Sequence, residues 1–153
     1  MARTTFINEL LQAGYRTLVA DVDAVWLKNP LDYLAKQLGD KNLLAQDDAP
    51  YNGHVICGGF MYLANTDGMR DLWQKVLAGH KEIVSHATQA GALRGIDESE
   101  QVILTQLLRQ NPSIKHGYLS PDAFPNGDLV FNRGDPASNA FVVHNNFVIG
   151  GDP

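Results

Sequence analysis

Two aspartates with a single residue between them follow directly on a short apolar run. The run at residues 18–20 suits a buried strand, and Asp21 and Asp23 come next. Side chains two positions apart in an extended chain point to the same face, so the two carboxylates converge and repel each other. A divalent cation removes this repulsion, because Mg²⁺ and Mn²⁺ accept oxygen ligands. The pair therefore indicates a metal site, with a solvated loop as the alternative.

Other polar side chains that could serve the same chemistry occur later in the chain. His144 follows a second apolar run at residues 141–143, and an imidazole beside two carboxylates is a normal ligand set for Mn²⁺. Glu100 and Gln101 stand at the start of an expected helix, where polar groups can point into a cleft. Asp97 and Glu100 also have the D-x-x-E spacing of a capping box, a structural role that would explain both residues.

Short apolar runs alternate with amphipathic stretches along the whole chain. Helices are expected around residues 6–11, 31–38, 69–77 and 102–108, and strands around residues 18–20, 43–45, 55–63 and 141–143. Residues 80–95 are weakly patterned and predict part helix and part loop, and residues 121–128 predict a loop. The alternation predicts an α/β fold with a largely parallel sheet, in which ligands bind at the carboxyl ends of strands.

Composition narrows the class of protein. The chain has 153 residues, of which 44% are hydrophobic and 19% charged, as expected for one globular domain. The net charge of −5 and the lack of a basic run argue against a nucleic-acid partner. No apolar stretch approaches the roughly 20 residues that span a bilayer.

A cysteine and two glycines interrupt the strand that is expected at residues 55–63. The single cysteine, Cys57, excludes an internal disulfide and is interpreted as a small buried residue, not a nucleophile. Gly58 and Gly59 follow it, and glycines inside a strand predict a close approach of another part of the chain to its backbone.

Several blocks of the sequence resemble, in order, those of the nucleotide-diphospho-sugar transferases. This family of glycosyltransferases includes plant α-xylosyl- and arabinosyltransferases. The blocks are LLQAGYRTLVADVDAVWLKNPLDYL, CGGFMYLANTDGMRDLWQKVL, EQVILTQLL, FPNGDLVF and VVHNNFVIGG. They cover nearly the whole chain, and the resemblance implies a GT-A-like fold with a mixed, mostly parallel sheet that is flanked by helices.

The resemblance implies roles for individual residues. Asp21 and Asp23 match the DxD motif, whose aspartates bind Mn²⁺ or Mg²⁺ on the diphosphate of the donor, and His144 matches a further metal ligand. Glu100 and Gln101 match an acidic residue and a glutamine near the reacting sugar, and are the candidate catalytic residues. The residues expected to bind the donor are Asp21, Asp23, Asn145, Asn146, Gly58 and Gly59.

The function implied by the resemblance is metal-dependent transfer of a sugar with retention of configuration. The donor would be a nucleotide-diphosphate sugar, of the UDP-sugar type, and the acceptor a glycan or glycoprotein. The resemblance also implies work in the Golgi lumen if the source is a eukaryote.

The sequence departs from the family pattern in side chains and in length. Glu100 replaces an aspartate, and Thr105 replaces an asparagine. The nucleotide-binding stretch that precedes these blocks in the family is absent from these residues. Residues 1–153 are therefore expected to form a single partial catalytic domain without the N-terminal nucleotide-binding strands.

Two alternative functions fit the same residues. The chain could be an inactive or binding-only remnant of a transferase domain. It could also be a haloacid-dehalogenase-like phosphatase, with Asp21 as nucleophile and Asp23 as general acid. Such a phosphatase also needs a later lysine and a pair of acids beside the metal, and no strand with paired acids is expected after Gln101.

Overall fold

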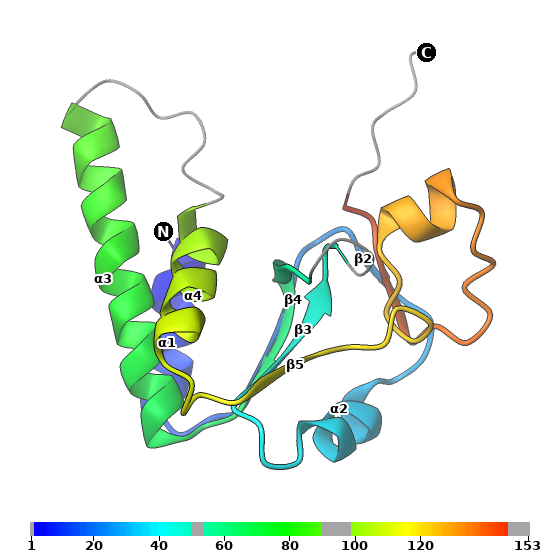
Figure 1. Cartoon of the computed structure of the whole chain (residues 1–153), viewed down its shortest axis with the longest axis horizontal. Coiled ribbons are helices and arrows are strands. Elements are labelled where there is room, and N and C mark those ends of the chain that lie inside the picture. Colours follow the sequence, from blue (N-terminus) through cyan, green and yellow to red (C-terminus); the bar gives the residue numbers. More distant parts are fainter. Residues whose placement is uncertain (1, 50–53, 90–98, 147–153) are drawn as a thin grey trace. The chain divides into compact units, whose positions relative to one another are not determined.

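The computed structural model describes residues 2–49, 54–89 and 99–146, and it contains helices and strands in alternation (Figure 1). The helices are α1 (Ala2–Gln12), α2 (Leu31–Leu38), α3 (Asp67–Gln89) and α4 (Ser99–Gln110), with a short π-helix η1 (Asp128–Asn132). The strands are β1 (Thr17–Ala20), β2 (Ala24–Trp26), β3 (Leu43–Asp47), β4 (Ile56–Leu63), β5 (His116–Tyr118) and β6 (Val142–His144). None of the described helices is long and apolar enough to cross a membrane.

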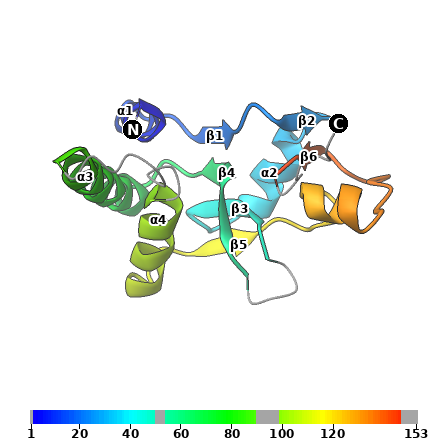
Figure 2. The same cartoon turned by 90° about the horizontal axis from the view of Figure 1, so that it is seen from above.

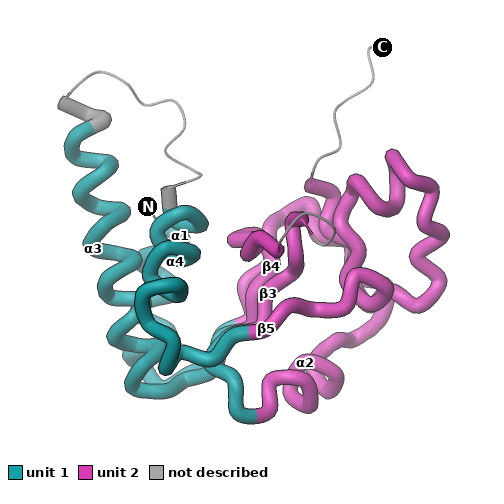
Figure 3. Tube along the Cα trace, viewed as in Figure 1, with its two compact units in different colours: residues 1–17, 40–43, 63–116 teal, residues 18–39, 44–62, 117–153 magenta. Residues whose placement is uncertain are grey.

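The chain divides into two compact units, which Figure 3 colours separately. The helical unit consists of residues 1–17, 40–43 and 63–116, and it contains α1, α3 and α4. The sheet unit consists of residues 18–39, 44–62 and 117–153, and it contains α2, η1 and most residues of the strands.

In the helical unit, α3 packs against both α1 and α4. Trp73 of α3 is fully buried, and its indole nitrogen donates a hydrogen bond of 3.0 Å to the carbonyl of Thr4 in α1. The hydroxyl of Thr66 accepts from the Met69 amide at 3.2 Å and so satisfies a free donor at the start of α3. Helix α1 ends just before Gly14, whose φ of 95° favours glycine.

In the sheet unit, the main sheet has the strand order β1-β4-β3-β5 (Figure 2). The amide of Asp48 donates to the carbonyl of Val55 at 2.9 Å, as expected where β3 and β4 run antiparallel. All residues of β4 are buried, and this strand has a hydrogen-bonded neighbour on each side. Strands β2 and β6 form a separate antiparallel pair.

Aromatic side chains form much of the core of the sheet unit. Phe124 lies between Phe60 and Phe141, with ring centroids 5.4 Å and 5.9 Å away, and Tyr33 of α2 packs on Phe141 at 5.0 Å. Such ring pairs add to the stabilisation that burial alone gives. The predicted mixed α/β fold, with helices beside a sheet, is confirmed.

The structure differs from the sequence prediction in four elements. Strands β2 and β5, with three residues each, and the π-helix η1 were not expected. Helix α3 continues to Gln89, through most of a stretch that was predicted to be partly loop. The turn-rich stretch before η1 is a loop, as predicted, and it carries a parallel bridge between Asn126 and His144.

Candidate metal and donor site

The side chains of Asp21, Asp23 and His144 converge in the sheet unit. Each offers one ligand atom, and these atoms all lie within 4.8 Å of one another. The Nε2 atom of His144 is 3.2 Å from an oxygen of Asp23 and 3.8 Å from an oxygen of Asp21. The imidazole is only 3% exposed, whereas the Asp21 and Asp23 side chains are 38% and 46% exposed. We refer to these three residues as the metal cluster.

Backbone hydrogen bonds hold Asp21 at the end of β1. Its amide donates to the carbonyl of Gly59 in β4 at 2.8 Å, so the sheet ladder extends one residue beyond the strand. Its carbonyl accepts from the amide of Ala24 at 3.1 Å, which closes a turn that contains Asp23. Both carboxylates are therefore placed by a turn at the carboxyl end of a strand, where ligands of α/β sheets bind.

The pairing of β2 with β6 brings His144 to the same turn. Ala24 lies opposite His144 in this pair. The residue that follows Asp23 in the chain is therefore paired directly with the histidine. The amide of Asn145 donates to the carbonyl of Asp23 at 3.3 Å, just beyond the pair. The register of this short pair therefore decides which side chain of β6 faces the aspartates.

Gly59 makes room for the metal cluster, in agreement with the close approach predicted from the two glycines. A Cβ atom on Gly59 would lie 2.4 Å from Cε1 of His144 and 2.5 Å from an oxygen of Asp21. Both distances are far below van der Waals contact, so only glycine fits without moving both ligands. The prediction that Gly58 and Gly59 contact the donor stays a prediction.

A residue that the sequence analysis missed lies directly behind the imidazole. The side-chain oxygen of Gln46 is 2.8 Å from Nδ1 of His144, and Gln46 is only 2% exposed. The one signal in the sequence is a polar residue at the end of the apolar run LLAQ in β3. A lone glutamine of this kind does not indicate a partner nearly a hundred residues away.

The Cys57 sulfur lies 3.5 Å from the same imidazole nitrogen, Nδ1, and Asn145 and Asn146 follow His144 in the chain. Burial, and then the negative charge of Asp48, raise the pKa of the Cys57 thiol and favour its neutral form. Cys57 is buried, as predicted. The amide nitrogen of Asn146 donates to Asp48 at 2.7 Å. Among the described residues, the side-chain oxygens of Asn145 and Asn146 are buried and have no hydrogen-bond partner. Their predicted contact with the donor stays a prediction.

The two candidate catalytic residues lie in the helical unit, on α4. The Glu100 carboxylate is buried, accepts a hydrogen bond from the hydroxyl of Thr4, and lies 3.5 Å from the guanidinium of Arg3. The hydroxyl of Thr4 is also 2.8 Å from Nδ1 of His80. Glu100 therefore links α4 to α1, and its catalytic role stays a prediction.

Three other residues singled out in or near α4 are Gln101, Thr105 and Asp97. The backbone carbonyl of Gln101 accepts from the hydroxyl of Thr105 at 2.8 Å, so Thr105 is used within its own helix. The proposed capping box cannot be compared with the structure, because Asp97 lies outside the described residues. The catalytic role of the Gln101 side chain stays a prediction.

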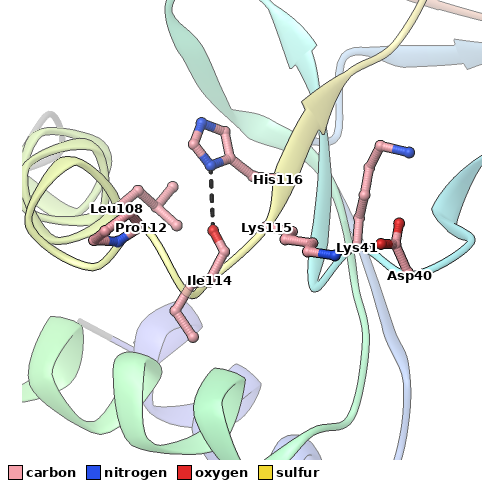
Figure 4. A pocket seen from close by; sticks show the side chains of 7 residues that line it. All are labelled: Asp40, Lys41, Leu108, Pro112, Ile114, Lys115 and His116. Atoms are coloured by element: carbon pink, nitrogen blue, oxygen red, sulfur yellow. Dashed lines mark hydrogen bonds and ion pairs between the residues drawn. The ribbon is translucent and has the colours of Figure 1, made fainter.

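The helical unit also contains an open cavity of about 480 Å³ (Figure 4). Its lining residues are Asp40, Lys41, Leu108, Pro112, Ile114, Lys115 and His116. Lys115 forms an ion pair with Asp40 at 2.5 Å, and these two side chains are largely solvated. No predicted site residue is among those that line this cavity.

The fold and the cluster together define an α/β protein with a paired-carboxylate and imidazole site at the ends of its strands. The chain belongs to the nucleotide-diphospho-sugar transferase family, which it matches over residues 1–153. The family named from the sequence blocks is thereby confirmed.

Curated relatives are glycosyltransferases. The chain is 28% identical to the UDP-D-xylose:L-fucose alpha-1,3-D-xylosyltransferase of Arabidopsis thaliana, over 98% of this chain and 44% of the relative. It is 27% identical to the beta-arabinofuranosyltransferase RAY1 of Arabidopsis thaliana, over 94% of this chain and 29% of the relative. It is 24% identical to the UDP-galactose:fucoside alpha-3-galactosyltransferase of Dictyostelium discoideum, over 94% of this chain and 24% of the relative. The chain thus spans less than half the length of these relatives, and no solved structure matches it significantly.

Proposed function

We propose that this chain is part of the catalytic domain of a metal-dependent glycosyltransferase that takes a sugar from a nucleotide-diphosphate sugar. The observation that carries the proposal is the convergence of three ligand atoms, from Asp21, Asp23 and His144, within 4.8 Å of one another. Family membership supports the transfer chemistry, and the cluster supports its dependence on a cation.

The residues of the cluster fit a divalent cation. Two carboxylates and one neutral imidazole form a mixed oxygen and nitrogen set, which suits Mn²⁺ and, with less preference, Mg²⁺. The carboxylates are half-exposed, so a hydrated ion can reach them and keep water or phosphate oxygens as further ligands. The clustered negative charge also favours a cation, because two close carboxylates repel when nothing neutralises them.

The chemistry requires stabilisation of a leaving diphosphate. When the bond from the anomeric carbon to the phosphate oxygen breaks, negative charge grows on the diphosphate. A bound cation supplies the opposing charge as a Lewis acid. Asp21 and Asp23 hold that charge at the solvent-accessible side of the cluster, and the buried His144 holds it from the interior.

The donor and acceptor classes follow from the relatives. Two of the relatives described above are named for UDP-sugars and for fucose or a fucoside as acceptor. We extend the UDP-sugar donor and a glycan acceptor to this chain, with retention of configuration at the transferred sugar. Which sugar is transferred depends on residues that the metal cluster does not contain.

A pair of isosteric substitutions tests the metal site. Asp23→Asn removes one ligand charge, and Asp32→Asn removes the charge of an exposed aspartate on α2 that takes no part in the cluster. Isothermal titration with Mn²⁺ should show at least a tenfold loss of affinity for D23N and no change for D32N. Equal affinity of D23N and the unchanged chain would refute the metal site.

Titration with UDP-xylose and UDP-galactose in the presence of Mn²⁺ then separates the alternatives. Metal-dependent binding of a UDP-sugar supports the transferase. Binding of Mn²⁺ without any sugar nucleotide supports the binding-only remnant. Capture of beryllofluoride on Asp21 would instead support the phosphatase, because that anion mimics an aspartyl phosphate.

A further inference from the structure

The structure assigns Gln46 the task of positioning His144. We infer that the Gln46 side chain holds the imidazole in the tautomer that carries its hydrogen on Nδ1, which leaves Nε2 free to bind a cation. The inference rests on the proposed metal site and adds a residue that does not touch the metal. Gln46 is on β3, and His144 is on β6.

The orientation of the Gln46 amide follows from its neighbours. Its nitrogen lies 3.0 Å from the carbonyl oxygen of Phe124 and 2.9 Å from that of Pro125. Carbonyl oxygens only accept hydrogen bonds, so the NH₂ group must face them and both of its hydrogens are used. The reversed amide would place three oxygens together without a hydrogen. The oxygen of Gln46 is therefore the atom that faces His144.

The facing oxygen decides where the imidazole hydrogen resides. It lies 2.8 Å from Nδ1 of His144, a normal hydrogen-bond length, and it can only accept. Nδ1 must then donate, and in the neutral ring Nε2 keeps a lone pair. That lone pair is 3.2 Å from an oxygen of Asp23 and 3.8 Å from one of Asp21. The opposite tautomer would let Nε2 donate to Asp23, but it would leave two acceptors, Nδ1 and the Gln46 oxygen, facing each other at 2.8 Å in the interior. With hydrogen on Nδ1, three electron-rich atoms meet at one place, where a cation can bind.

Cys57 is the competing neighbour of Nδ1. Its sulfur is 3.5 Å from that nitrogen, and a neutral thiol is at best a weak donor or acceptor. A thiol that donated to Nδ1 would favour the opposite tautomer, in which Nε2 carries the hydrogen. The shorter contact with a fully oriented amide oxygen outweighs it. Because Gln46 and His144 are 2% and 3% exposed, water cannot readily replace this hydrogen bond.

The first measurement needs no substitution. Long-range ¹H–¹⁵N spectra of the metal-free chain at alkaline pH distinguish the two tautomers of a neutral imidazole by their ring nitrogen shifts. The expected result is hydrogen on Nδ1 of His144. Hydrogen on Nε2 would overturn the inference directly, whether or not any variant folds.

The second measurement compares two substitutions on the same strand. Gln46→Met keeps the length of the side chain but removes the acceptor. Asp47→Asn changes the next residue, whose side chain accepts from the amides of Ala49 and Val55 and pairs with His54, and contacts no member of the metal cluster. In titrations with Mn²⁺, the dissociation constant should rise by about 10- to 100-fold for Q46M and stay unchanged for D47N. Circular dichroism of both variants checks that they are folded.

The outcomes separate this inference from the proposed function. Equal Mn²⁺ affinity of Q46M and the unchanged chain overturns the role of Gln46 and leaves the metal site standing. Lack of Mn²⁺ binding by the unchanged chain overturns the metal site and, with it, the inference. Loss of affinity in Q46M, together with hydrogen on Nδ1 in the unchanged chain and a shift of that hydrogen toward Nε2 in Q46M, supports it. Hydrogen that stays wholly on Nδ1 in Q46M overturns the role of Gln46 in fixing the tautomer.

Discussion

The metal cluster depends on a single position where no side chain is tolerated. Gly59→Ala would place a Cβ atom 2.4 Å from the His144 ring and 2.5 Å from the Asp21 carboxylate. Both ligands, or the backbone of β4, must then move. We expect G59A to lower the affinity for Mn²⁺ by at least tenfold in isothermal titration, because a metal site needs its ligand atoms in place within a fraction of an ångström.

Gly79→Ala is the matched control for this substitution. Gly79 lies inside α3, and its Cβ would meet the Ile103 side chain at an ordinary distance of 3.4 Å. This variant should bind Mn²⁺ unchanged and unfold at slightly higher denaturant concentration, because alanine favours a helix by about 1 kcal/mol. An Mn²⁺ affinity of G59A equal to that of G79A would mean that the cluster rearranges without cost.

The three residues of the metal cluster could be predicted from their residue types and from the apolar runs before them. The residues that hold them in place could not. Asp21 and Asp23 follow a strand, and His144 ends another apolar run, so their chemistry is visible locally. The role of Gln46 depends on its hydrogen bonds to Phe124 and Pro125, which lie far along the chain and cannot be inferred from the local sequence. Periodicity describes one element at a time and contains no contact between elements.

At the scale of elements, the long periodic segments were predictable and the short ones were not. Strands β2 and β5 have three residues each, too few to show an alternation of apolar and polar positions. Yet β2 is the strand that brings His144 to the aspartates, through its pairing with β6. The register of that pair follows from tertiary packing, and the local sequence does not determine it.

Glu100 links two helices, and this link predicts a loss of stability on substitution. Glu100→Ala leaves the buried hydroxyl of Thr4 without its acceptor and removes the ion pair with Arg3. Urea unfolding should show a loss of about 1–3 kcal/mol for E100A and a smaller loss for Glu100→Gln, which keeps an acceptor oxygen.

The same two variants also test the catalytic role that the sequence suggests. If Glu100 has only a structural role, transfer activity should follow the folded fraction of each variant, and E100Q should remain active. Loss of activity in E100Q, with unchanged urea unfolding and unchanged Mn²⁺ affinity, would support the catalytic role instead. Retained stability of E100A would contradict the link between α1 and α4.

At the scale of the molecule, the cluster joins segments from near the two ends of the chain. Asp21 and Asp23 belong to the turn after β1, and His144 belongs to β6, yet all three lie in the sheet unit. A ligand that binds only the folded cluster stabilises the segments that form it. The helical unit contributes no residue to the cluster.

Mn²⁺ should therefore stabilise the chain against thermal unfolding through its sheet unit. At a free concentration of about 100 times the dissociation constant, binding contributes about 2.7 kcal/mol, and the midpoint of the transition in a calorimetric scan should rise. EDTA should reverse the rise, and D23N should not show it. If the units unfold in separate transitions, only the transition of the sheet unit should move, because its residues alone hold the ion. An equal rise in D23N would instead show that the cation acts on the net charge of −5 and not on the cluster.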